Sequence, residues 1–243
     1  MFTTYIVDPI YNAFVFLIGI MPGGDVGLAI IALTVVIRIV LYPVFTASIR
    51  SQMGLQAMQA ELEVEKAKLK DNKEALARAQ LALMRKYKVN PLALFGSLIL
   101  QMVAIGALYF AMFHEGFPDI AAERLYSFVS VPTAVNTYFL GFIDLLASHN
   151  MLMAVLSALT MYAAIKLTVA RTSSGQAPAD EQKAAQQRMQ NGLMLYFMPG
   201  LLGVLGYFFP AGVGLYFVAG NIFSVGQELL VKRKFAAEMA EPR

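Results

Sequence analysis

The sequence predicts an all-α integral membrane protein with five transmembrane helices, the N-terminus outside and the C-terminus in the cytoplasm. Hydrophobic residues make up 58% of the 243 residues and charged residues only 14%, a composition outside the range of soluble domains. Several apolar stretches are long enough to cross a bilayer, and the basic residues between them gather on one side. Cysteine is absent, which excludes disulfides and thiolate metal sites.

Residues 1–24 are predicted to form an N-terminal helix that lies along the membrane surface. Asp8 is the expected N-cap and Pro9 the first helical residue. The apolar run that follows ends at Met21, before a Pro-Gly-Gly sequence, and is shorter than the roughly 20 residues needed to span. A short additional span is the alternative interpretation.

The predicted core covers residues 25–234 and is followed by a short cytoplasmic tail over 235–243. Its five spans are apolar stretches separated by polar segments. They cover residues 26–44, 92–113, 151–168, 193–209 and 213–231. Of the 19 Lys and Arg residues, this topology places all but Arg38 and Arg124 in cytoplasmic segments or, for Lys166, at the cytoplasmic end of a span, which satisfies the positive-inside tendency.

Two polar segments are assigned to the cytoplasm. In residues 53–88, apolar residues recur at helical spacing on both sides of a break at 71–73, which predicts an antiparallel helical hairpin. Its many Lys and Glu residues are typical of a solvated face, and a partner surface or a contact with anionic lipid are the alternatives. Residues 169–192 form the second segment, a predicted loop.

Residues 114–150 are apolar enough to compete as a sixth span. Such a span would move the basic residues between 166 and 188 to the outer side, against the positive-inside tendency. Pro132 and Asn136 also disfavour a straight lipid-facing helix. We therefore expect an outer segment of interfacial or short helical pieces packed on the outer ends of the spans.

Arg38 lies inside the first span, where a charge is costly unless it faces water or a partner. Thr34, Arg38 and Tyr42 follow at four-residue steps and are expected to share one helix face. Other predicted spans carry polar side chains at a similar depth, with Glu228 as a candidate ion-pair partner of Arg38. They are Ser97, Gln101, Ser157, Thr160, Asn221 and Ser224. The set predicts a hydrophilic groove open to the cytoplasm and closed outside; helix packing and snorkelling of Arg38 are the alternatives.

Motifs for common enzymatic chemistry are missing from the sequence. It contains no phosphate-binding G-x-x-x-x-G-K-[ST], no G-x-S-x-G and no H-E-x-x-H. His114 and His149 are 35 positions apart and do not suggest a metal pair. We expect no enzymatic activity, cofactor or metal, and no nucleic-acid partner except a contact of the C-terminal Lys-Arg-Lys with ribosomal RNA.

Several stretches, taken in order, resemble the YidC/Oxa/Alb family of membrane protein insertases. They include AIIALTVVIRIVLYP with its single arginine, LMRKYKVNPL, and MPGLLGVLGYFFPAGVGLYFVAGNIFSVGQ, and the resemblance extends from about residue 5 to 234. Phe217 stands where the family commonly has tryptophan, and Gly220 where it commonly has a second asparagine.

The resemblance implies a five-helix core with a cytoplasmic coiled-coil hairpin in the bacterial cytoplasmic (inner) membrane. It also implies a groove that receives nascent hydrophobic segments and releases them into lipid. The implied partners are nascent membrane proteins, membrane lipid, the ribosome and a Sec translocon. From the residues alone, a small secondary transporter or channel in which Arg38 binds an anionic solute stays open, although no internal repeat supports it.

Overall fold

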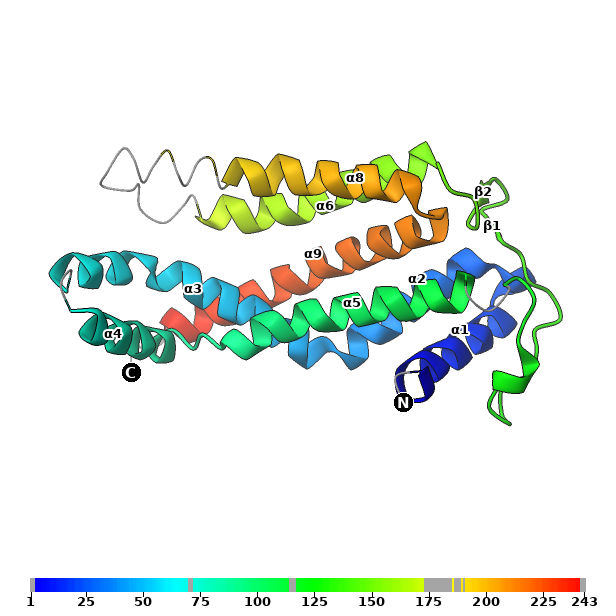
Figure 1. Cartoon of the computed structure of the whole chain (residues 1–243), viewed down its shortest axis with the longest axis horizontal. Helices are drawn as coiled ribbons and strands as arrows, with labels where there is room; N and C mark the ends of the chain where they lie inside the picture. Colours follow the sequence, from blue (N-terminus) through cyan, green and yellow to red (C-terminus); the bar gives the residue numbers. More distant parts are fainter. Residues whose placement is uncertain are drawn as a thin grey trace.

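The structure is a computed structural model that describes residues 3–69, 72–113, 117–172, 185, 189 and 191–240. It confirms the all-α membrane class, since its long helices lie side by side in an elongated bundle (Figure 1). A helical hairpin forms one end of the bundle and an irregular segment the other (Figure 1). By length and composition, four of the described helices can cross a membrane, and a bent helix pair supplies a fifth candidate.

The N-terminal element consists of a π-helical turn, η1 (Thr3–Val7), and α1 (Asp8–Ile20), which the 3-10 turn η2 (Pro22–Gly24) ends. Asp8 does not act as the expected N-cap, because Val7 before it is already helical (φ −71°, ψ −48°) and no side chain caps the helix. Helix α1 packs against α2 and α5. Residues Thr3–Ile20 also meet the length and hydropathy of a span, so the interfacial placement stays a prediction.

The first predicted span is not one straight helix. Helix α2 (Val26–Val40) and helix α3 (Tyr42–Lys68) meet at Leu41 with a bend of 69°. Pro43 lies in the first turn of α3, where its missing N–H costs no helical hydrogen bond, whereas it would interrupt a continuous helix. The bend corrects the expected stack of Thr34, Arg38 and Tyr42, since Tyr42 belongs to the second helix.

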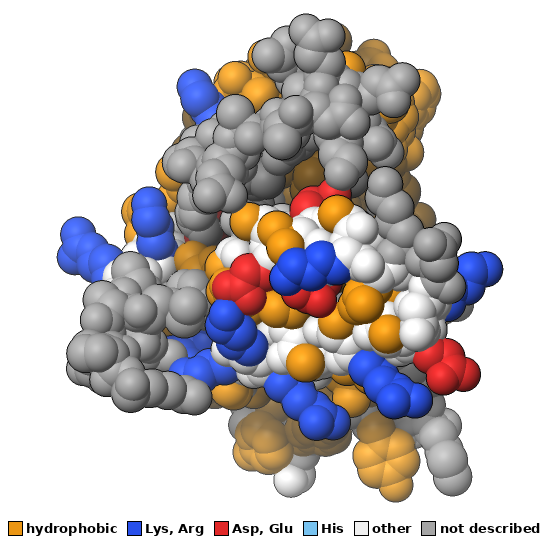
Figure 2. All heavy atoms as spheres, turned by 90° about the vertical axis from the view of Figure 1, so that its left-hand side faces the viewer, with side chains coloured by type: hydrophobic (Ala, Val, Ile, Leu, Met, Phe, Trp, Pro, Cys, Tyr) orange, Lys and Arg blue, Asp and Glu red, His pale blue; other side chains and the backbone are white. Residues whose placement is uncertain are grey.

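The cytoplasmic hairpin consists of α3 and α4 (Lys73–Lys86), as predicted, but its first helix begins at Tyr42 rather than near residue 53. Met58, Leu62 and Leu83 form the contact between the two helices. The Asn72 side chain caps α4 by accepting a hydrogen bond from the backbone N–H of Ala75 (2.9 Å). Lys and Arg side chains are spread over this end of the molecule, with acidic and apolar groups among them (Figure 2).

The remaining long helices are α5 (Pro91–Phe113), α6 (Met151–Thr172) and α9 (Ala211–Ala240). Between α6 and α9, η4 (Leu193–Phe197) and α8 (Met198–Phe208) cover the fourth predicted span. Together they form an apolar stretch that is shorter than the helices counted as long enough to cross a membrane. Helix α9 packs against both α2 and α6 and therefore lies between the two halves of the bundle (Figure 1).

Two predicted cytoplasmic segments are only partly described. Most of the predicted loop over 169–192 lies outside the described residues, and α6 extends into it as far as Thr172. The predicted tail over 235–243 is helical as far as Ala240, because α9 continues to that residue.

The outer segment is less helical than expected. Its described part, from residue 117, contains one 3-10 turn, η3 (Ala122–Arg124), and two short antiparallel strands, β1 (Tyr138–Phe139) and β2 (Ile143–Asp144). Residues at the ends of the spans form hydrogen bonds with its backbone. Val26 N–H donates to the carbonyl of Asn136 (3.0 Å), and Gly212 N–H donates to that of Leu145 (2.9 Å). These long-range bonds replace those that a helix would make locally.

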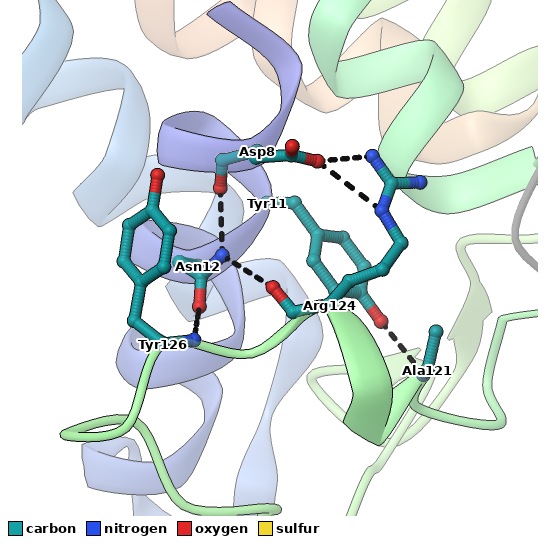
Figure 3. A network of polar contacts seen from close by, with 6 residues as sticks. All are labelled: Asp8, Tyr11, Asn12, Ala121, Arg124 and Tyr126. Carbon is teal, nitrogen blue, oxygen red and sulfur yellow. Dashed lines mark hydrogen bonds and ion pairs between the residues drawn. The ribbon is translucent and has the colours of Figure 1, made fainter. Parts of the chain in front are cut away.

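A polar network joins α1 to the outer segment (Figure 3). The guanidinium of Arg124 is paired with the carboxylate of Asp8. The side-chain amide of Asn12 donates to the carbonyl of Arg124 (3.0 Å) and accepts from the backbone N–H of Tyr126 (2.6 Å), while Tyr11 accepts from Ala121 N–H (2.9 Å). We call Asp8, Asn12 and Arg124, with these contacts, the outer clasp.

The main apolar core lies at the outer end of the bundle, beside the outer clasp. Its fully buried side chains come from α1, α2, α5, α9 and the outer segment. The largest are Tyr11, Phe14, Ile18, Ile30, Leu108, Met112 and Leu145. This packing supports a bundle that is closed on the outer side.

Candidate functional site

Arg38 is buried in the last turn of α2, with only 8% of its surface exposed. Its Nη2 donates a hydrogen bond to Oε1 of Gln101 on α5 (3.2 Å), and Nε2 of Gln101 donates to the hydroxyl of Tyr216 on α9 (3.0 Å). The ring of Phe45 on α3 lies over the guanidinium, 4.4 Å from Cζ. Among the described residues, the charge of Arg38 is therefore held by neutral dipoles and an aromatic face rather than by a carboxylate.

Gly220 provides the space in which Arg38 lies. A Cβ at this position of α9 would be 3.3 Å from Nη2 of Arg38 and 3.9 Å from the methyl carbon of Thr34. The hydroxyl of Thr34 donates to the carbonyl of Ile30 in its own helix (2.7 Å). Thr34 therefore lines the space beside Arg38 but directs its hydroxyl proton elsewhere.

A second polar group joins α6 to α9. The side-chain amide of Asn221 donates to the hydroxyl of Thr160 (3.2 Å), and the buried hydroxyl of Ser157 donates to the carbonyl of Gly214 (3.1 Å). Ser224 donates to the carbonyl of Gly220 within α9 (2.8 Å). These contacts are of the kind that holds membrane helices together.

A third polar group lies where the hairpin meets the spans. The hydroxyls of Ser48 on α3 and Ser97 on α5 are 2.8 Å apart. The side-chain amide of Gln227 on α9 donates to the carbonyl of Tyr42 (3.2 Å) and to the hydroxyl of Thr46 (3.0 Å), both in the first turns of α3. Gln227 is only 3% exposed, and its Oε1 has no hydrogen-bond partner among the described residues.

Glu228 does not pair with Arg38 in the described part of the chain. Its carboxylate accepts hydrogen bonds from the hydroxyl of Thr168 on α6, at 3.2 and 3.4 Å. Gly220 is the residue of α9 that lies beside Arg38, and Glu228 is eight residues further along, roughly 12 Å by helical rise. The structure therefore does not support Glu228 as a candidate ion-pair partner of Arg38, because the two residues lie at different depths.

The predicted groove residues thus form separate clusters on different sides of α9. Gly220 faces Arg38, whereas Asn221 faces Thr160, because consecutive helical residues point about 100° apart. Sequence reasoning missed Tyr216 and Gln227. Tyr216 lies in an apolar run that gives no local signal, whereas Gln227, three positions after Ser224, falls on the same polar helix face. The described residues include no cluster of three or more His, Asp or Glu side chains suited to a metal.

Comparison with known proteins identifies the family. A family model described as 60Kd inner membrane protein matches residues 18–238. The chain belongs to this family. All the candidate groove residues lie within the matched region of the 60Kd inner membrane protein family, whereas Asp8 and Asn12 of the outer clasp precede it.

Relatives within the 60Kd inner membrane protein family include a protein of Oceanobacillus iheyensis named membrane protein insertase YidC, 31% identical over 87% of this chain and 76% of the relative. The membrane protein insertase MisCA of Bacillus subtilis is 27% identical over 98% of this chain and 82% of its own length. A YidC of Anaeromyxobacter dehalogenans is 32% identical, but the match covers only 34% of that protein. Family and helices together place the chain in the bacterial inner membrane as a multi-pass protein.

Proposed function

We propose that this protein receives nascent hydrophobic segments from the cytoplasm and inserts them into the bacterial inner membrane, alone or beside a Sec translocon. The relatives' name, membrane protein insertase, supports this function. The structural observation that carries the proposal is Arg38, buried within a span and bound only to neutral groups among the described residues. No observation favours a transporter.

In the proposed mechanism, Arg38 attracts the polar or acidic flank of a nascent segment. A guanidinium without a bound carboxylate keeps its attraction for anionic groups, and the attraction is strong where little water screens it. Gln101, which bridges Arg38 and Tyr216, offers an amide that exchanges partners with an entering polypeptide. The arginine thus lowers the barrier for the part of the substrate that lipid would reject.

Lipid supplies the driving force for the rest of the segment. Burying about 20 apolar residues yields tens of kcal/mol in gross transfer free energy, so insertion requires no nucleotide hydrolysis. We infer that a hydrophilic groove opens on the cytoplasmic side, lined by Arg38, Gln101 and their polar neighbours. The hairpin of α3 and α4 would receive the substrate or the ribosome.

The decisive experiment changes the charge at position 38. Vesicles carrying Arg38→Ala or Arg38→Lys are tested for insertion of a single-span protein with an acidic translocated tail. We expect alanine to abolish most of the insertion. Lysine should retain a substantial part of it because it keeps the charge, and lose the rest because it does not keep the hydrogen-bond geometry. Arg78→Ala removes an exposed charge (82% exposed) from the hairpin and serves as the matched control. Unchanged insertion with Arg38→Ala would refute the charge role.

Accessibility tests the groove separately. The chain has no native cysteine, so single cysteines at positions 38, 101 and 221 can be labelled without background. We expect water-soluble thiol reagents to reach these positions from the cytoplasmic side, at least while a substrate is engaged. Crosslinking a stalled nascent chain to the same positions, beside a solute flux assay in liposomes, separates an insertase from a transporter.

A further inference from the structure

The outer segment carries large apolar side chains on both of its faces, and its exposed polar side chains between residues 126 and 142 are the uncharged Ser127, Ser130, Thr133 and Asn136. Phe139 and Ile143 point toward the core and are 9% and 4% exposed, whereas their neighbours Tyr138 and Phe142 point outward and are 51% and 66% exposed. The outward face also includes exposed apolar side chains elsewhere in the segment. These are Tyr126, Phe128, Val131 and Leu140. A half-buried strand that faces water normally alternates apolar and polar residues, so this pattern indicates an apolar medium outside.

The distribution of charged residues also indicates an apolar medium around the outer segment. From Leu125 to Ile143 the sequence contains no Asp, Glu, Lys, Arg or His. Charged residues flank this stretch at Arg124 and Asp144, and the turn between the strands has positive φ at Leu140 (52°) and Gly141 (79°). The turn therefore presents Leu140 and Phe142 at its tip, beyond the paired strand residues Tyr138 and Asp144.

Backbone hydrogen bonds fix the level of the segment relative to the membrane. Val26 N–H donates to the carbonyl of Asn136 (3.0 Å), and His149 N–H donates to that of Tyr207 (2.7 Å). These contacts lie at the outer ends of α2 and α8, opposite the hairpin of α3 and α4 (Figure 1). The outer segment is thus held at the level where the apolar parts of the spans end.

We propose that the outward face of residues 126–142 inserts into the interfacial region of the outer leaflet and anchors the outer end of the bundle to lipid. Tyrosine and phenylalanine rings suit this position, since the tyrosine hydroxyl reaches the headgroups while the ring lies in hydrocarbon. The anchor rests on the membrane topology and does not depend on the insertase activity.

The absence of tryptophan from the chain makes the proposal directly testable. Phe142→Trp and, independently, Phe128→Trp are purified as full chains and reconstituted into phosphatidylcholine vesicles that contain acyl chains brominated at defined depths. We expect blue-shifted emission from both, with the strongest quenching by bromine near the headgroups. Both native side chains are exposed, so the substitutions do not disturb the core.

Two reference variants calibrate the depth. Leu81→Trp, 57% exposed on α4 of the cytoplasmic hairpin, reports water, and Leu98→Trp, 59% exposed on α5, reports the hydrocarbon interior. The anchor predicts quenching of Phe142→Trp several-fold stronger than that of Leu81→Trp and shallower than that of Leu98→Trp. Emission and quenching equal to those of Leu81→Trp would overturn it. A blue shift in native membranes but not in pure lipid would also overturn it, because the face would then bind a protein.

Discussion

Arg38 and Gly220 illustrate how a single residue governs the candidate site. The guanidinium lies close to the bare backbone of α9, where an added Cβ would make a tight contact of 3.3 Å with Nη2, and it also contacts one amide and one ring. A second asparagine, which the family resemblance leads one to expect at position 220, would occupy this space. The position of Arg38 in this chain therefore depends on a glycine in the neighbouring helix.

This dependence predicts a difference between two glycines of α9. Gly220→Ala places a methyl group about 3.3 Å from Nη2 of Arg38, whereas Gly226→Ala meets no atom within 4 Å. We expect Gly220→Ala to reduce insertion of the acidic-tailed substrate, less severely than Arg38→Ala. Gly226→Ala should keep full activity and favour the helix by up to about 1 kcal/mol. Equal activities of the two variants would show that the packing at Gly220 is not needed.

Among the elements, the bent pair of α2 and α3 connects the site to the cytoplasm. Pro43 accounts for the break in the helix, and Gln227 binds the first turns of α3 from α9. Ser48 and Ser97 hold the same part of α3 against α5. We infer that these contacts fix the direction in which the hairpin leaves the membrane.

Replacing Gln227 should allow the hairpin to leave the membrane over a wider range of directions. In Gln227→Leu, both hydrogen bonds to α3 are lost, and the hydroxyl of Thr46 loses a buried partner, at a typical cost of about 1–3 kcal/mol. We expect a broader distribution of distances between spin labels at Ala57 on α3 and Ile222 on α9. Ser224→Ala is the control, because its hydroxyl bonds within α9. A distribution as narrow as that of the parent protein would argue against the role of Gln227.

The hairpin itself should respond to pH through Glu61. Hydrogen bonds from Lys86 (2.7 Å) and from the Tyr87 hydroxyl (2.7 Å) lower the pKa of Glu61 below its ordinary value of 4.5. Since the folded carboxyl is the stronger acid, its stabilisation is present above pH 4.5 and is lost as the pH falls through the lowered folded value.

Spin labels at Ala67 and Ala77, near the tip of the hairpin, measure this effect. We expect a narrow distance distribution at neutral pH that broadens below the folded pKa of Glu61, and a broad one at both pH values in Glu61→Gln. Glu74→Gln should behave like the parent, because Glu74 pairs with Arg78 in the same helix. If Glu61→Gln leaves the distribution unchanged at neutral pH, the contact does not hold the hairpin closed.

At the scale of the whole molecule, the two ends of the bundle are built differently. The cytoplasmic end carries the hairpin, many charges and the polar contacts of Ser48 and Gln227, while the outer end is closed by the apolar core and the outer clasp (Figures 1 and 3). This asymmetry supports a path that opens toward the cytoplasm only. It also makes α1 part of the core fold, since the outer clasp ties it to a segment more than 100 residues away.

Loss of the outer clasp should therefore destabilise the whole chain. Asn12→Ala removes bonds to the backbones of Arg124 and Tyr126 from a site that is 2% exposed, and we expect a loss of about 1–3 kcal/mol. Asp8→Asn should cost less, at most about 1 kcal/mol, because the ion pair is partly exposed. Thermal unfolding in detergent measures both, with Gln59→Ala on the surface of α3 as the control. A Tm for Asn12→Ala equal to that of the control would contradict the clasp.

The sequence by itself determined the membrane class, the sidedness and the existence of the hairpin. Apolar length and the distribution of basic residues act through the bilayer, which recognises each segment without reference to its neighbours. Arg38 was likewise identified from the sequence, because a charged residue within an apolar run can be recognised without knowledge of the fold. Only the tertiary structure decided that the first span bends at Leu41, that Gln101 rather than Glu228 reaches Arg38, and that the described part of the outer segment is mostly irregular. These features depend on which helices become neighbours and at what depth their residues meet, and no local pattern in the chain carries that information.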